Sequence, residues 1–233
     1  MLELAKHLYP IPRSLTGDGI KASLDIFQSI HPEFHTLSFE SGTKVFDWTI
    51  PQVWNVKDAY IEHESGQRFC EFSVNNLHLV GYSEPVDITL EKSELIKFLH
   101  SRHDLPGAIP YVTSYYAKRW GFCLSRTQLD QLPEGSYRCF IDSSFAKGTL
   151  DLIEAVLPGQ SSEEIFFSSY LCHPSMANNE LSGPVLLSAI MTHLKKMQNR
   201  KYTYRFVLLP ETIGSIAYLS TRLNELKGNV IAG

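Results

Sequence analysis

The stretch that decides the fold begins with Ile165-Phe-Phe-Ser-Ser-Tyr-Leu171 and ends with Tyr204-Arg-Phe-Val-Leu-Leu209. Both are short apolar runs rich in aromatic and branched side chains, which is typical of buried strands. Between them, apolar residues recur at helical spacing from Leu186 to Leu194. A strand, a helix and a second strand in this order predict a right-handed crossover, and therefore an α/β fold.

The same alternation continues on both sides of this stretch. Two more strands are predicted at residues 136–142 and 148–157, and Ser182 is expected to cap the helix of the crossover. A second helix should begin near Gly214 and end near Gly228, and residues 230–233 begin a further strand. A last strand with no helix after it indicates an interrupted fold, so we expect a truncated piece of a longer protein.

The first 125 residues have a different pattern. Two helices are predicted within residues 1–30, separated by the proline- and glycine-rich turn at 10–19. Residues 36–90 alternate between apolar and polar side chains and should be β-rich, and a short amphipathic helix is expected at 91–100. The aromatic group at 104–125 is more typical of packing than of a ligand site.

Composition excludes several classes of protein. Apolar residues make up 43% and charged residues 20% of the chain, which is ordinary for a globular domain. A net charge of −4 is unlike the basic footprint of a nucleic-acid-binding protein. The four cysteines have no C-x-x-C spacing, and the chain shows neither a signal peptide nor an apolar run that could span a membrane. We therefore predict a cytoplasmic protein without nucleic-acid or membrane partners.

Polar residues follow the two strands of the opening stretch. His173 comes directly after the first strand, and Glu211 after the second. Because ligands bind at the carboxyl ends of strands in α/β sheets, these two side chains could converge there. A histidine and a carboxylate suit Zn²⁺, and a carboxylate can also act as a general base. The alternatives are a structural histidine and a glutamate that caps the following helix.

Two further residues near this site have competing interpretations. Cys172 precedes His173, and neighbouring side chains on a strand point to opposite faces. The two could therefore pair only if the strand had already ended, and we expect Cys172 to be a buried structural thiol. Arg13, in the turn at residues 10–19, could hold a substrate carboxylate or could belong to an ordinary surface turn.

Specific segments resemble a known family. They include Ser169-Tyr-Leu-Cys-His-Pro-Ser-Met-Ala-Asn-Asn-Glu-Leu-Ser-Gly-Pro184 and Pro210-Glu-Thr-Ile-Gly-Ser-Ile-Ala-Tyr-Leu219. They look like a bacterial family of polysaccharide biosynthesis proteins with an aminopeptidase-like domain, which is related to the M28 zinc aminopeptidases. The resemblance implies a mixed sheet flanked by helices, formed by residues 1–46 and 126–233. It also implies a smaller inserted β-rich domain at 47–125.

The resemblance also assigns roles to residues. His173 matches the first zinc-ligand histidine, Asn179 matches an aspartate that binds or bridges zinc, and Glu211 matches a ligand or the general base. Here the chain departs from the family, because its acidic side chain is Glu180 and position 179 is a neutral amide. A small loop shift could let Glu180 replace Asn179 as a ligand. The cofactor implied is one zinc ion or two.

These expectations define two function classes. The first is a zinc-dependent aminopeptidase-like hydrolase, a metallopeptidase that cleaves an N-terminal residue or a related amide in a peptide or small substrate. In that reading Glu211 is catalytic and Arg13 contacts the substrate. The second is a catalytically inactive, metal-poor protein linked to polysaccharide biosynthesis that binds a peptide or glycan or serves as a scaffold. A homo-oligomer is compatible with both.

Overall fold

The computed structural model describes all residues from 1 to 233 and divides them into two compact units. Unit 1 contains Met1–Val53 and Lys147–Gly233, and unit 2 contains Trp54–Ala146. The chain therefore leaves unit 1 once and returns to it once, which is the pattern of an inserted domain.

The boundaries of the insertion differ from the expected range of 47–125. The second boundary lies at Ala146 because strand β9 (Ser136–Ala146) belongs to the sheet of unit 2, where its residues 136–141 pair with β6 (Val86–Glu91). The apolar pattern of β9 predicts a strand but does not reveal its partner, since a pattern of period two reports only which side chains are buried.

Unit 1 is built on a mixed sheet of five strands. Their order is β1 (His35–Glu40), β10 (Thr149–Leu157), β12 (Thr203–Leu209), β11 (Glu164–Tyr170) and β13 (Val230–Ala232). β10 is antiparallel to both of its neighbours, whereas β11 is parallel to β12 and β13. The predicted mixed α/β fold with flanking helices is confirmed.

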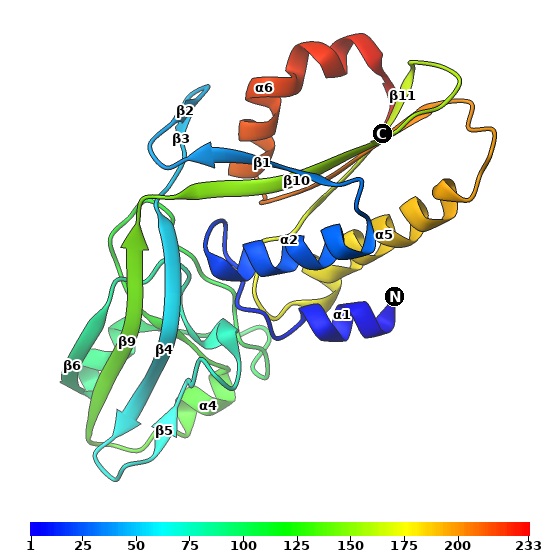
Figure 1. Ribbon diagram of the computed structural model, residues 1–233. Helices are drawn as coiled ribbons and strands as arrows, with labels where there is room; N and C mark the ends of the chain where they lie inside the picture. The colour runs from blue at the N-terminus through cyan, green and yellow to red at the C-terminus, as the bar shows by residue number, and fades with distance from the viewer. The chain divides into compact units, whose positions relative to one another are not determined.

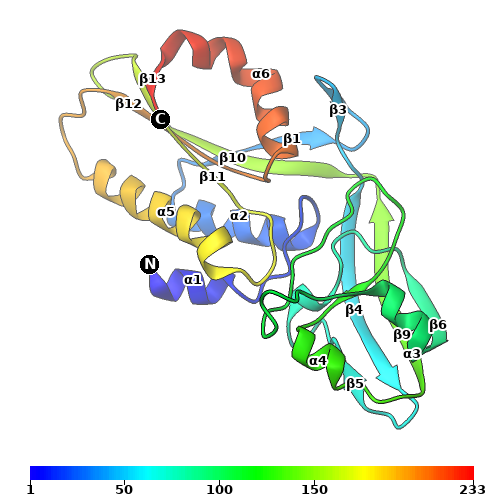
Figure 2. The same ribbon diagram turned by 180° about the vertical axis from the view of Figure 1, so that it is seen from behind.

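Helices cover both faces of this sheet (Figures 1 and 2). Helices α1 (Leu2–Leu8), α2 (Asp18–Ile30) and α5 (Ser182–Lys195) lie on one face, and α6 (Ile213–Asn229) lies on the other. The main core fills the space between the sheet and the first group; its buried members are Leu8, Ile20, Leu24, Phe27, Phe34, Ile153, Ala155, Leu157, Leu171, Leu181, Val185, Leu187, Met191, Leu194, Phe206 and Leu208.

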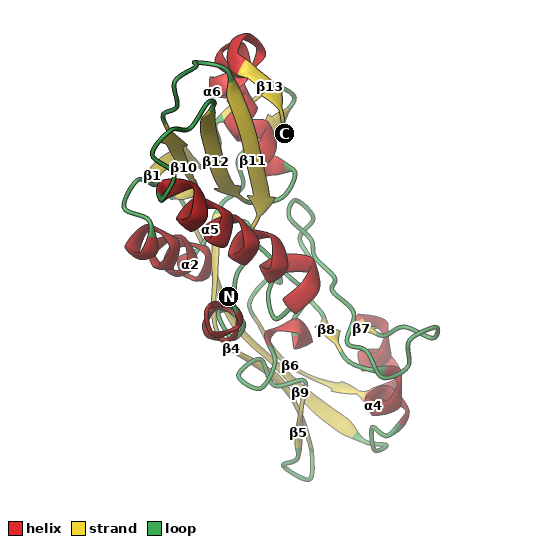
Figure 3. Cartoon of the chain, turned by 90° about the vertical axis from the view of Figure 1, so that its right-hand side faces the viewer, coloured by secondary structure: helices red, strands yellow, loops and turns green.

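Strand β10 shows how the sequence assigns the two faces. Ile153, Ala155 and Leu157 belong to the core on the side of α2 and α5, which also lie together on that side in Figure 3. Glu154 alternates with them and accepts a hydrogen bond from the Tyr218 hydroxyl of α6 on the opposite face. This follows from the period of two in a strand, and it allows one nearly continuous apolar run to carry a buried charge.

Unit 2 is centred on an antiparallel sheet with the order β5 (Arg68–Phe69), β4 (Val53–His63), β9 and β6. The β-rich character expected of this part of the chain agrees with that sheet. The smaller elements of the chain are β2 (Lys44–Val45), β3 (Trp48–Thr49), β7 (Leu99–His100), β8 (Phe122–Cys123), α3 (Lys92–Leu95), α4 (Arg126–Asp130), and the 3₁₀ turns η1 (Asn76–His78) and η2 (Ile96–Phe98).

Two expected helix features are wrong in detail. The segment at 91–100 forms α3, η2 and β7 in succession instead of one helix. Ser182 is not the cap of α5, because a π turn, η3 (Ala177–Leu181), precedes that helix and places Ser182 inside it. The Ser182 hydroxyl donates back to the carbonyl of Asn178 instead.

None of the helices is both long enough and apolar enough to cross a lipid bilayer.

Candidate metal centre

Two parallel strands bring His173 and Glu211 together. β11 and β12 are in register up to the pair Tyr170 and Leu209, so the residues that follow both strands leave the same edge of the sheet. His173 Nε2 lies 3.2 Å from Glu211 Oε2. This is the convergence expected for neighbouring parallel strands. Thr212 is the N-cap residue of α6 and the helix has no side-chain cap, so capping does not account for Glu211.

Glu180 holds the other side of the His173 ring. Its Oε2 lies 2.7 Å from His173 Nδ1, and its Oε1 accepts hydrogen bonds from the backbone N–H of His173, at 2.7 Å, and of Cys172. The side chain is fully buried. A buried carboxylate is stable only when its oxygens are satisfied in this way.

Arg13 lies beneath the same loop. Its side chain is 2% exposed, Nε donates to the carbonyl of His173 at 3.2 Å, and Nη1 donates to the carbonyl of Leu8 at 2.5 Å. Burial lowers the pKa of Arg13 to about 10, although the charge of Glu180 opposes that shift. In this structure Arg13 supports the backbone around His173, and its contact with a substrate stays a prediction.

Cys172 is buried between the two strand ends. β11 ends at Tyr170, so Cys172 and His173 no longer point to opposite faces, and Sγ lies 3.7 Å from His173 Nδ1. The backbone N–H of Glu211 donates to the same sulfur at 3.2 Å. Burial, together with the charge of Glu180, raises the pKa of the Cys172 thiol well above its usual value. The thiolate form that a nucleophile requires is therefore disfavoured.

Asn179 is not brought into this group. Its side chain is exposed on η3 and forms no hydrogen bond with His173, Glu180 or Glu211. The exposed and buried positions at 179 and 180 depend on the π turn, whose closing hydrogen bond runs from Ser182 N–H to the carbonyl of Ala177. No feature of the sequence Ala-Asn-Asn-Glu-Leu distinguishes such a turn from a regular helix start.

The distances indicate where a metal ion would fit. Donor atoms of Cys172, His173 and Glu180 all lie within 4.8 Å of one another. However, the 2.7 Å between His173 Nδ1 and Glu180 is a hydrogen-bond distance, whereas two ligands of a tetrahedral Zn²⁺ lie about 3.4 Å apart. The 3.2 Å between His173 Nε2 and Glu211 is close to that ligand spacing. Glu211 is also about half exposed, so further coordination positions there are open to solvent.

Comparisons of the sequence agree with the resemblance described above. The family model described as "Domain of unknown function (DUF4910)" matches residues 2–233. A protein of Clostridium acetobutylicum, named as a candidate polysaccharide biosynthesis protein with aminopeptidase-like domain, is 44% identical over 225 residues. The alignment covers 96% of this chain and 51% of that protein, so the chain spans about half the length of this curated relative.

Solved structures support the same fold. The crystal structure of a candidate peptidase from Clostridium acetobutylicum has a TM-score of 0.94 at 42% identity, over 99% of this chain and 55% of that one. A peptidase M28 precursor from Shewanella amazonensis gives 0.65 at 13% identity, over 99% and 69%. A zinc aminopeptidase from Bacillus subtilis gives 0.59 at 12% identity, over 94% and 62%. The last two similarities show a shared fold.

Proposed function

This chain belongs to the DUF4910 family, and we propose that it supplies part of the active site of a zinc-dependent, aminopeptidase-like hydrolase. The single observation that carries the proposal is the pair formed by His173 Nε2 and Glu211 Oε2, 3.2 Å apart at the ends of parallel strands. The names of relatives add support, since they include an aminopeptidase-like domain and a zinc aminopeptidase.

The pairing of these two atoms calls for a positive charge between them. His173 Nδ1 is engaged by the Glu180 carboxylate, which can only accept hydrogen bonds when ionised. In a neutral ring, Nε2 then offers a lone pair to a second carboxylate, and two acceptors at 3.2 Å repel one another. A proton or a metal cation between them removes that repulsion. Histidine nitrogen and carboxylate oxygen are both common zinc donors.

In this proposal the residues of the chain have separate tasks. His173 Nε2 and Glu211 Oε2 would hold the ion, and bound Zn²⁺ supplies polarisation of a carbonyl and a more acidic water. Glu211 is about half exposed, and its second oxygen makes no hydrogen bond, so it can accept a proton from a water molecule beside it. Arg13 and Glu180 hold the backbone of His173 through its carbonyl and its N–H.

The test is the zinc content of the purified chain, measured by elemental analysis after dialysis against trace zinc. We expect bound zinc that is lost in both His173→Ala and Glu211→Ala. Glu91→Ala, which removes an exposed carboxylate in unit 2, serves as the matched control and should retain the metal. Hydrolysis of aminoacyl-p-nitroanilides by the zinc-loaded chain is the second readout. A chain that takes up no zinc above the Glu211→Ala background contradicts the proposal.

A second function is favoured by the small number of solvent-accessible side chains that could bind a metal ion. Zinc sites that catalyse reactions use three protein ligands, but of the four side chains at this site only Glu211 is exposed, because His173, Glu180 and Cys172 are buried. The second candidate is therefore a metal-poor binding or scaffold protein with an aminopeptidase-like fold. Absence of zinc together with saturable binding of a peptide or glycan fragment would favour it.

A further inference from the structure

We propose that Glu180 is a positioning residue for His173 and not a metal ligand, and that the site therefore holds a single cation. This inference rests on the proposed function, because it concerns the same site. In this inference Asn179 has no role in binding the metal, and Glu180, the acidic side chain of the loop, orients the ring of His173.

The hydrogen bonds of Glu180 occupy most of the positions at which its carboxylate could bind a metal. An ionised carboxylate has about four acceptor positions. Three are used, by the backbone N–H groups of Cys172 and His173 and by His173 Nδ1, and the side chain is fully buried. A cation at the open side of the ring, next to Glu211, lies across the imidazole from Glu180. Glu180 could reach it only by giving up these bonds.

The π turn η3 explains why Glu180 occupies this position. A π turn contains one residue more than the corresponding α-helical turn, so side chains before and after it are displaced by one position relative to a regular helix. Glu180 thereby points toward His173, and Asn179 points to solvent. A site with two metal ions about 3.5–4 Å apart needs donors to both ions. On the open side only His173 Nε2 and Glu211 are available, which is too few for two ions.

The bond to Glu180 also selects the form of the histidine. Because an ionised carboxylate only accepts hydrogen bonds, His173 must carry a proton on Nδ1. The lone pair of the neutral ring is then on Nε2, on the side of Glu211. Partners of this kind on the second ring nitrogen fix the tautomer and orientation of metal-binding histidines, and their loss typically weakens metal affinity about 10–100-fold.

The deciding variant is Glu180→Gln, which has the same size. Its amide oxygen can still accept the two backbone N–H bonds, but its NH₂ group then faces His173 Nδ1 and donates to it. The proton of the ring is forced onto Nε2, the nitrogen that should bind the metal. Asn179→Ala is the matched control, because it changes the neighbouring side chain, which is exposed and lies outside the hydrogen-bonded group. Near-ultraviolet circular dichroism checks that both variants are folded.

Two measurements are made on the 233-residue chain. Competition with a chromophoric chelator gives the zinc dissociation constant and stoichiometry, and ¹⁵N NMR of the metal-free protein gives the tautomer of His173. We expect one zinc per chain in wild type and in Asn179→Ala with equal affinity, and about 10–100-fold weaker binding in Glu180→Gln. The NMR signals should show a protonated Nδ1 in wild type and an unprotonated Nδ1 in Glu180→Gln.

Other results overturn the inference in distinguishable ways. Two zinc ions per chain, or a large loss of affinity in Asn179→Ala, would mean that residue 179 is a ligand. Unchanged affinity in Glu180→Gln with an unchanged tautomer would remove the positioning role. If wild type binds no zinc, the proposed function and the single-cation site both fail, and the NMR comparison still decides whether Glu180 sets the tautomer of His173.

Discussion

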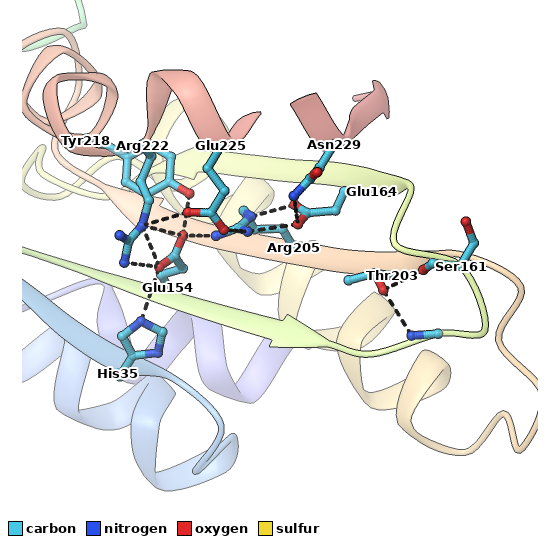
Figure 4. A network of polar contacts seen from close by, with 11 residues as sticks. His35, Glu154, Ser161, Glu164, Thr203, Arg205, Tyr218, Arg222, Glu225 and Asn229 are labelled. Carbon is cyan, nitrogen blue, oxygen red and sulfur yellow. Dashed lines mark hydrogen bonds and ion pairs between the residues drawn. The ribbon is translucent and has the colours of Figure 1, made fainter. Parts of the chain in front are cut away.

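Replacing Arg205 by methionine should be among the most destabilising single changes in unit 1. Arg205 lies on β12 beneath α6 (Figure 4), and its side chain is 3% exposed. Its Nε and Nη2 donate to the two oxygens of Glu164 at 2.6 and 2.9 Å, and Nη1 donates to Glu154. Both glutamates are buried as well. The guanidinium thus compensates two charges that cannot be hydrated.

The size of the effect follows from the hydrogen-bond partners that each glutamate keeps in the Arg205→Met variant. Without Arg205, Glu154 retains the Tyr218 hydroxyl at 2.5 Å and Arg222 at 3.0 Å. Glu164 retains only the amide of Asn229, at 3.4 Å. One buried charge is then left nearly uncompensated, which typically costs about 3–5 kcal/mol. That is a large share of the roughly 5–15 kcal/mol by which a domain is usually stable.

Urea unfolding followed by far-ultraviolet circular dichroism measures this change. The signal reports mainly on unit 1, because the long helices α2, α5 and α6 all belong to it. With a slope of about 2–3 kcal/mol per molar urea, the midpoint should fall by roughly 1–2 M. In the control Arg222→Met, which removes a partly exposed side chain, the loss should stay below about 1 kcal/mol.

A double variant separates loss of charge compensation from loss of packing. Arg205→Met combined with Glu164→Leu removes both members of the pair, and we expect it to recover a large part of the lost stability, since apolar replacement of a buried pair is often neutral. Two results would refute the reasoning: a stability of Arg205→Met within about 1 kcal/mol of wild type, or a double variant no better than the single one.

Three further predictions concern other parts of unit 1. Burial alone would raise the pKa of Glu154, but Tyr218, Arg222 and Arg205 lower it from 4.5 to about 2. A depressed carboxyl pKa stabilises the folded state, and this stabilisation is lost as the pH falls. The free energy of unfolding of wild type should therefore drop by about 3 kcal/mol between pH 4.5 and 2 through Glu154. In urea titrations, the free energy of unfolding of Glu154→Gln should depend less on pH over this range. Because burial raises the pKa of Cys172, iodoacetamide should label this thiol far more slowly in the native than in the unfolded chain, as judged by mass spectrometry; equal rates would contradict this. A Cβ at Gly159 would overlap the Tyr202 carbonyl, so Gly159→Ala should lower the melting temperature, whereas Gly228→Ala in α6 meets no atom within 4 Å and should raise it slightly.

The sequence was sufficient to predict the central crossover and the meeting of two site residues. The apolar runs before His173 and Glu211 have the length and composition of buried strands, and a helical pattern separates them. These features depend on local periodicity and on the geometry of parallel strands, which vary little between α/β proteins. The 3.2 Å between His173 Nε2 and Glu211 Oε2 agrees with that reasoning.

The remaining parts of the site depend on features that the spacing of apolar residues in the sequence does not predict. Glu180 is buried beside His173 because of one additional residue in a turn, and Arg13 reaches the His173 carbonyl from 160 positions away in the chain. The sequence likewise does not identify the partner strand of β9, since the alternating apolar pattern of β9 would suit either sheet. Long-range hydrogen bonds and strand pairing are set by the assembled structure, whereas patterns report only local burial.

The π turn has a consequence for how relatives of this chain should be compared. A turn that gains or loses one residue exchanges its inward and outward side chains, although the aligned letters on either side remain the same. Two homologues could then carry an acid in adjacent alignment columns and still present it to the same histidine. Conservation scored column by column would record this as the loss of a functional residue, when the side chain has kept its place in space.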